Sequence, residues 1–157
     1  MRTLKDLFLV SVVLLLVSCS LSAQSDKSKT ESTAAQGEVV ALTKADFLTK
    51  VYNYEKNPQE WVYEGSRPCI VDFYADWCGP CKRVAPVLKE LAKEYKNDII
   101  IYKINVDSEE ELANAFDVQS IPTLLFIPMK GKPQAARGVL SKEDFVRQIN
   151  GFMLGKK

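Results

Sequence analysis

The feature that most constrains the fold is an almost uninterrupted apolar run at residues 68–75, followed directly by a helical pattern at 78–96. A short apolar run of this kind fits a strand that is buried on both faces, as in a sheet covered by helices. In the second segment, large apolar side chains recur at the spacing of an amphipathic helix. Together the two segments predict one strand–helix unit of an α/β domain.

The chain continues this alternation from residue 38 to its C-terminal end. Further strands are predicted at 38–42, 99–106, 123–127 and 134–140, and further helices begin near Thr43, Ser108 and Ser141. Helices between strands imply parallel pairing, whereas the short turn at Lys130-Gly131 implies an antiparallel hairpin at one edge. The predicted order is β-α-β-α-β-α-β-β-α, with a central mixed β-sheet flanked by helices.

Two short polar motifs predict where helices begin. Thr43 and Ser141 are each followed three residues later by an aspartate, Asp46 and Asp144. A hydroxyl and a carboxylate at this spacing can each accept a hydrogen bond from the other's backbone N–H, which is the capping-box arrangement. By contrast, the segment 55–67 carries Pro58 and Gly65 and reads as a loop. Its Trp61 either pins the loop to the domain or extends a partner surface.

The first 23 residues have the pattern of an export signal. Arg2 and Lys5 precede an apolar run at 7–17, and such runs are roughly 7–15 residues long in signal peptides. A membrane-spanning helix needs about 20 residues, so this run is too short to be one. We therefore expect an exported, periplasmic protein with a signal at 1–23.

The way in which the signal is cleaved stays open. Residues 16–19, Leu-Val-Ser-Cys, resemble the bacterial lipobox, which would make Cys19 the lipidated first residue after a signal at 1–18. Ordinary cleavage after Ala23 is the alternative. Lipidation at Cys19 is the only membrane attachment that we expect.

A polar segment separates the signal from the folded part of the chain. Residues 24–37 contain no large apolar side chain, and such a segment cannot bury enough surface to offset its ordering entropy. We interpret it as a flexible linker. The folded domain is then expected at 38–157, which is long enough for a single core.

Composition excludes several classes of chemistry. The chain has no histidine, so catalysis by histidine and histidine metal ligands are ruled out. Its 21 basic and 20 acidic residues leave a net charge of +1, which predicts no binding to nucleic acid. A structural zinc site needs four ligands, and beside the pair at 78 and 81 the folded domain contains only Cys69, with Cys19 a possible fourth only if it remains after the signal is cleaved. We expect no metal and no cofactor.

Residues 77–82, Trp-Cys-Gly-Pro-Cys-Lys, carry the chemistry that the sequence points to most directly. Two thiols separated by two residues can close into a disulfide and reopen without unfolding the chain. Cys78 falls at the first turn of the predicted helix, where free backbone N–H groups and the helix dipole favour a thiolate. A thiolate is the nucleophile in disulfide exchange.

The segment 71–82 strongly resembles the thioredoxin family, and in particular an exported bacterial member of it. Further matches follow in order along the chain and together cover nearly all of residues 39–152. They are Ala85-Pro86, Lys103 to Asp107, Ile121-Pro122-Thr123, Gly131 and Gly138. The resemblance implies the thioredoxin fold and a thiol–disulfide oxidoreductase that acts on protein disulfides.

The resemblance also implies a role for each thiol. Cys78 would be the exposed attacking thiol, and Cys81, one turn into the helix, the buried resolving thiol. The two would close the Cys78–Cys81 disulfide as a reduced substrate leaves, in a step that is fast because it is intramolecular.

Asp72 is a carboxylate inside an apolar strand. Burial disfavours its charged form and should raise its pKa, which suits a general base for the Cys81 proton. Lys103, on the neighbouring strand, would be its charge partner. The alternative of a surface-facing aspartate is weak, because Ile70 and Tyr74 on the same face are apolar or aromatic.

A docking surface beside the cysteine pair is also implied by the resemblance. Pro122 would form a cis peptide bond and leave the backbone of Ile121 free to pair with an extended substrate strand. Trp77, Gly79, Pro80 and Gly138 would complete a flat, mostly apolar surface for that substrate.

The direction of electron flow is the least determined part of this interpretation. The Gly79-Pro80 dipeptide is that of reducing family members, so we favour a reductase supplied with electrons by a membrane or soluble redox partner. A periplasmic oxidant or isomerase is the alternative, and a redox-silent binding module is a weaker one. Cys69 is interpreted as a buried strand residue, with a redox-sensitive third thiol as the alternative.

Overall fold

The computed structural model describes residues 36–156 of the 157-residue chain. The predicted signal at 1–23, with Cys19, and all but the last two residues of the predicted linker at 24–37 lie outside the described residues. Between residues 36 and 156, no helix is both long and apolar enough to cross a membrane.

Five strands form one mixed sheet in the order β1-β3-β2-β4-β5. Strands β1, β3 and β2 are parallel, β4 runs antiparallel to β2, and β5 runs antiparallel to β4. The strands are β1 (Val39–Ala41), β2 (Cys69–Tyr74), β3 (Ile100–Asn105), β4 (Thr123–Ile127) and β5 (Gln134–Arg137). The predicted mixed sheet is therefore confirmed, including the antiparallel edge strand. That edge strand is shorter than predicted, because the backbone at Gly138 has a left-handed φ of +86°.

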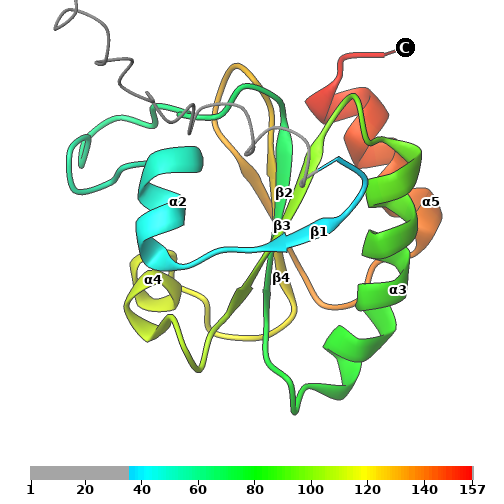
Figure 1. The fold of residues 1–157 in the computed structure, drawn as a ribbon, viewed down its shortest axis with the longest axis horizontal. Coiled ribbons are helices and arrows are strands. Elements are labelled where there is room, and N and C mark those ends of the chain that lie inside the picture. Colours follow the sequence, from blue (N-terminus) through cyan, green and yellow to red (C-terminus); the bar gives the residue numbers. More distant parts are fainter. Residues whose placement is uncertain (1–35, 157) are drawn as a thin grey trace, which may run out of the picture. The chain divides into compact units, whose positions relative to one another are not determined.

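Helices cover both faces of the sheet, with α2 and α4 on one side and α3 and α5 on the other (Figure 1). The helices are α2 (Lys44–Lys50), α3 (Gly79–Glu94), α4 (Glu110–Ala115) and α5 (Lys142–Arg147), which continues into a π-helical turn, η1 (Gln148–Met153). Both predicted capping boxes are present, between Thr43 and Asp46 and between Ser141 and Asp144. Helix α4 begins without a side-chain cap. The preceding Glu109 instead accepts a hydrogen bond from the backbone N–H of Lys44, at the start of α2.

Strand β2 contributes to a separate hydrophobic core on each face of the sheet. Ile70 packs with the apolar sides of α3 and α5, whereas Val71 and Phe73 pack with Phe47 of α2 and Leu112 of α4. All five of these side chains are fully buried. The strand is therefore buried on both faces, as its apolar sequence predicts.

The segment between α2 and β2 is held against the second of these cores. The rings of Tyr52 and Trp61 lie 4.3 Å apart between centroids, and Tyr52 also forms a β-bridge with Tyr63. The ammonium group of Lys44 lies 2.8 Å from the carboxylate of Glu55. Trp61 thus pins the loop to the domain, which resolves the choice that the sequence left open.

Cys69, the first residue of β2, is a fully buried free thiol. Its burial raises the pKa of the thiol to about 12, although the nearby Tyr63 hydroxyl favours the thiolate. A thiol with this pKa is almost entirely protonated at neutral pH, so it is a poor nucleophile. The structure therefore supports the interpretation of Cys69 as a packed strand residue.

Candidate active site

The N-terminus of α3 places the two cysteines. Cys78 is the N-cap residue, and its Sγ accepts a hydrogen bond from the backbone N–H of Cys81, with 3.1 Å between N and S. Gly79 and Pro80 form the first turn, where a proline costs little because its missing N–H would have no partner within the helix. The same backbone N–H and the helix dipole favour a thiolate on Cys78 when the pair is reduced.

Cys78 and Cys81 form a disulfide, with 5.3 Å between their Cα atoms. Each cysteine is 3% exposed, so the predicted contrast between an exposed Cys78 and a buried Cys81 is wrong for the disulfide form. Cys78 is covered because the loop before β4 lies against it, with the Ile121 carbonyl oxygen 3.8 Å from its Sγ. The sulfur carries no proton in the disulfide, so we treat this approach as a packing contact.

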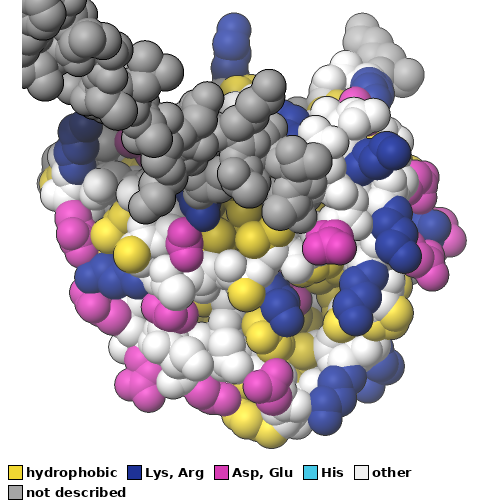
Figure 2. Space-filling view, viewed as in Figure 1, with side chains coloured by type: hydrophobic (Ala, Val, Ile, Leu, Met, Phe, Trp, Pro, Cys, Tyr) yellow, Lys and Arg dark blue, Asp and Glu magenta, His cyan; other side chains and the backbone are white. Residues whose placement is uncertain are grey.

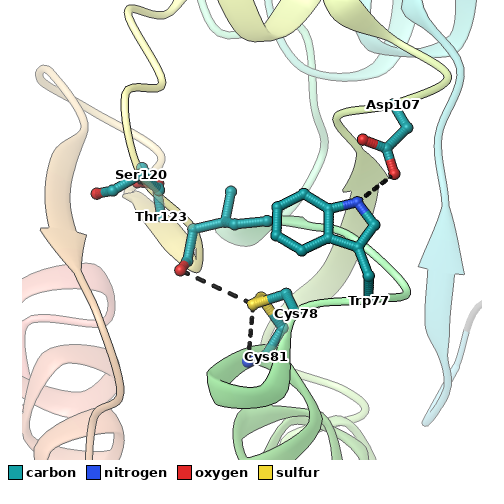
Figure 3. The surroundings of a disulfide bond; sticks show 7 residues. Trp77, Cys78, Cys81, Asp107, Ser120 and Thr123 are labelled. Atoms are coloured by element: carbon teal, nitrogen blue, oxygen red, sulfur yellow. Dashed lines mark hydrogen bonds between the residues drawn. A yellow bond between two sulfur atoms is a disulfide. The ribbon is translucent and has the colours of Figure 1, made fainter.

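The loop before β4 is fixed by two hydrogen bonds. The Ile121–Pro122 peptide bond is cis, as the resemblance implies. On one side, the Thr123 hydroxyl donates to the Ser120 carbonyl oxygen at 2.7 Å. On the other, the Gly138 backbone N–H donates to the Pro122 carbonyl oxygen at 2.8 Å. These bonds hold the loop whose Ile121 carbonyl oxygen approaches the Cys78 sulfur, and Ser120 and Thr123 of this loop lie near Cys78 in Figure 3.

Trp77 lies on the surface next to the disulfide and is 69% exposed. Its indole N–H donates to the Asp107 carboxylate at 2.9 Å (Figure 3). The Asp107 backbone N–H in turn donates to the Asn105 side-chain oxygen at 2.9 Å. The Trp77 side chain therefore contributes little to the hydrophobic core. We did not predict Asp107 as its partner, because the pairing joins loops thirty residues apart.

Asp72 is buried in β2, only 4% exposed, and directly opposite Lys103 in the β2–β3 register. Its Oδ1 atom has no hydrogen-bond partner within residues 36–156. Burial raises the pKa of this carboxyl to about 7, while the positive charge of Lys103 acts in the opposite direction. The raised pKa that the sequence predicts is thus present, and burial is its cause.

Lys103 is less closely engaged with Asp72 than we expected. Its ammonium group lies over the Tyr74 ring, 5.1 Å from the ring centroid. Within the described part of the chain, the two side chains form no ion pair shorter than 4 Å. Lys103 therefore influences the Asp72 carboxyl from a distance, without contact.

A cavity of about 510 Å³ connects these groups to the surface. Asp72, Cys81 and Lys103 all line it, together with residues from the start of β1 and one face of α3. The cavity is large enough to admit water to the Asp72 carboxyl and the Cys81 sulfur. The sequence gives no sign of this space, because it lies between elements that are distant along the chain.

These features define a class of protein. A disulfide that spans the first turn of a helix, beside a proline loop and above a buried carboxyl, is the redox centre of a thiol–disulfide oxidoreductase.

Comparison with known proteins names the family. The thioredoxin family model matches residues 38–151. The chain is 47% identical over 113 residues to a thioredoxin from Borreliella burgdorferi, covering 72% of this chain and 96% of that protein. It is 40% identical over 111 residues to a thioredoxin from Mycobacterium bovis, covering 71% and 86% of the two chains.

A third relative is the bifunctional thioredoxin reductase/thioredoxin of Mycobacterium leprae. It is 50% identical over 114 residues, covering 73% of this chain and 22% of that protein. The chain belongs to the thioredoxin family, and the expected fold and enzyme class are confirmed.

The raised pKa of Asp72 gives a prediction about stability. A carboxyl whose pKa is about 7 in the folded protein, against an ordinary value of 3.8, binds its proton more tightly in the folded state. Its contribution is therefore most favourable below pH 4 and is lost as the pH rises through 7, by about 4 kcal/mol in all. We expect Asp72→Asn to match the wild type near pH 4 and to exceed it in unfolding free energy at pH 8.

Urea denaturation of the oxidised proteins at both pH values measures this difference. Asp76→Asn, at an exposed position in the same region, is the matched control and should change little at either pH. If the difference in unfolding free energy between Asp72→Asn and the wild type is the same at pH 8 as at pH 4, the burial argument is contradicted.

Proposed function

We propose that this protein is an exported reductase of protein disulfides. The observation that supports it best is the position of the Cys78 sulfur. This atom lies at the N-cap of α3 and 3.8 Å from the Ile121 carbonyl oxygen, where an extended backbone can pair. One end of the site therefore favours a thiolate, and the other offers main-chain hydrogen bonds to the chain that brings the disulfide.

The reaction has two exchange steps. The Cys78 thiolate attacks one sulfur of the substrate disulfide, which forms a mixed disulfide and releases the other substrate sulfur as a thiolate. The Cys81 thiolate then attacks Cys78, which closes the Cys78–Cys81 disulfide and releases the second substrate sulfur. Two electrons pass to the substrate, so a dithiol partner, membrane-bound or soluble, must return two electrons before the next cycle.

We assign the proton of Cys81 to Asp72. The resolving thiol must lose this proton before it can attack, and the chain contains no histidine to accept it. Asp72 and Cys81 line the same cavity, so a water molecule there can relay the proton. With its pKa raised to about 7 by burial, the carboxyl can accept a proton near neutral pH and release it again.

We propose that electrons flow from this protein to its substrate, as in a reductase, because Gly79 and Pro80 form the dipeptide of reducing relatives. A reduction potential nearer about −270 mV than −120 mV is expected on this basis. The assignments of Trp77, Ile121, Pro122 and Gly138 to substrate docking are part of the same proposal. All four surround the Cys78 sulfur or the loop that covers it.

The cysteine variants separate the two exchange steps. We expect Cys81→Ser to accumulate the mixed disulfide with insulin, because the resolving thiol is missing, and Cys78→Ser to form none. The measurement is non-reducing electrophoresis after a timed reaction, with turnover followed in dithiothreitol. Cys69→Ser is the matched control, since its thiol is fully buried, and it should keep wild-type turnover. Full turnover by the double Cys78→Ser, Cys81→Ser variant would overturn the enzymatic mechanism.

The same reaction tests the role of Asp72. In the Asp72→Asn variant, we expect the mixed disulfide to decay more slowly than in the wild type, and most clearly near pH 7. The first exchange step should keep its rate, because Cys78 is activated by the helix terminus. Unchanged decay of the mixed disulfide across pH 6 to 8 would show that Asp72 is not the base.

The direction of electron flow is tested in the cell of origin. Alkylation of free thiols immediately after acid quenching reports the redox state of the Cys78–Cys81 pair. A reductase is expected to hold most of this pair in the dithiol form. A pair found mostly as disulfide would support an oxidant or isomerase and overturn the direction proposed here.

Export is proposed from the N-terminal sequence alone. We expect the mature protein to begin at a lipidated Cys19, or at Gln24 if the signal is cleaved after Ala23. The intact mass of the protein purified from its own cell envelope distinguishes the two. A mass that corresponds to the uncleaved chain would contradict export.

A further inference from the structure

Charged side chains are separated across the edge of the molecule that carries the disulfide. Figure 2 shows basic side chains gathered over α3, at the right, and acidic side chains over α4, at the lower left. The whole chain has 21 basic and 20 acidic residues, so its composition does not require this separation. The two helices lie on opposite faces of the sheet (Figure 1).

The basic side begins within one turn of the disulfide. Residues 79–89 contain Lys82, Arg83 and Lys89 and no acidic residue, and all three side chains are exposed. Within residues 36–156 none of them forms an ion pair or a side-chain hydrogen bond. Lys82 directly follows Cys81, and its backbone N–H donates to the Cys78 carbonyl oxygen at 3.2 Å, so this residue lies in the first turn of α3 beside the redox centre.

Acidic residues near α3 only partly offset this charge. Glu90 and Glu94 both lie within 3.4 Å of the ammonium group of Lys142, so they are already engaged. Glu38 and Asp76 line the same cavity as Lys82 and Lys89. The first half of α3 nevertheless has more basic than acidic groups.

The acidic side is the segment 107–117, which includes α4. It contains five carboxylates and no basic residue. Lys44 engages two of them, Glu109 through its backbone N–H and Glu111 through its ammonium group. The other three are exposed and have no cationic partner within residues 36–156. They are Asp107, Glu110 and Asp117.

This acidic segment also reaches the redox centre. Asp107 accepts the hydrogen bond from the Trp77 indole at 2.9 Å, and Trp77 directly precedes Cys78. The disulfide therefore lies between the basic side chains of Lys82, Arg83 and Lys89 on one face of the sheet and the acidic segment 107–117 on the other. A chain that docks at Ile121 must pass between fields of opposite sign.

We propose that this edge docks a substrate segment whose own charges are divided, with acidic side chains over α3 and basic side chains over the segment 107–117. The proposal rests on the proposed function and adds the chemistry of the partner to it. At physiological ionic strength, exposed charges act over about 8 Å, so they influence a chain bound at the disulfide. Such complementarity raises the association rate and fixes the orientation of the partner.

The test uses three peptide disulfides that differ only in the residues flanking their reactive cysteine. One is neutral, one has glutamates before and lysines after this cysteine, and the third has the reverse order. Main-chain pairing at Ile121 gives the peptide one direction, so only one charged isomer can place both charges correctly. We expect the wild type to reduce that isomer about fivefold faster in kcat/KM at low salt. In 1 M NaCl, where the Debye length is about 3 Å, the ratio should approach one.

A charge-swapped variant provides the decisive comparison. It combines Lys82→Glu and Arg83→Glu with Glu110→Lys and Asp117→Lys, and it should reverse the preference between the two isomers. Asp107 is left in place because it holds Trp77. The matched control is Lys130→Glu with Lys132→Glu, in the exposed β4–β5 turn, which should keep the wild-type preference.

Each outcome has a distinct meaning. Equal rates for the two isomers at low salt, or an unchanged preference in the swapped variant, would overturn the docking proposal. The neutral peptide monitors folding and chemistry. If the swapped variant loses turnover of that peptide, the Lys82→Glu, Arg83→Glu double variant replaces it and should at least halve the preference. If the wild type itself fails to reduce the neutral peptide, the proposed function is wrong.

Discussion

Burial of β2 on both faces is the constraint on which the rest of the structure depends. Its two neighbours, β3 and β4, satisfy its backbone hydrogen bonds, while the two cores take its alternating side chains. Because the strand is fixed in this way, the turn that follows it has a fixed position. That turn carries Trp77 and Cys78 and begins α3. The reactive sulfur is therefore placed by the central strand of the sheet, although the sulfur itself lies just beyond the end of that strand.

The same burial makes one residue of the strand costly. Asp72 shares β2 with side chains that are apolar, and no partner within the described residues satisfies its Oδ1 atom. A domain selected only for stability would place an apolar side chain there, because an unpaired buried carboxyl opposes folding. The chain keeps the carboxyl where it lines the same cavity as Cys81. We interpret this as stability given up for proton transfer, as is common at active sites.

How much the sequence predicts depends on the range of the interaction. The strands, the capping boxes at Thr43 and Ser141 and the burial of Asp72 follow from local patterns, and all are present. The exposure of Cys78 was wrongly predicted because the loop that covers it is more than forty residues away. The bond from Trp77 to Asp107 and the cavity beside Asp72 were missed for the same reason. These features depend on how loops meet, and a pattern within one segment carries no information about that.

The loop before β4, which covers Cys78, depends on the outermost strand for one of its hydrogen bonds. The Pro122 carbonyl is held by the Gly138 N–H, at the end of β5, and β5 pairs with the sheet through β4 alone. Edge strands generally open more easily than central ones, because fewer contacts must break. Opening of the end of β5 would therefore remove one of the two hydrogen bonds that fix the loop beside Cys78 and leave the bond from Thr123 to Ser120. Partial fraying of this strand would loosen the site while leaving the buried strand beneath the disulfide intact.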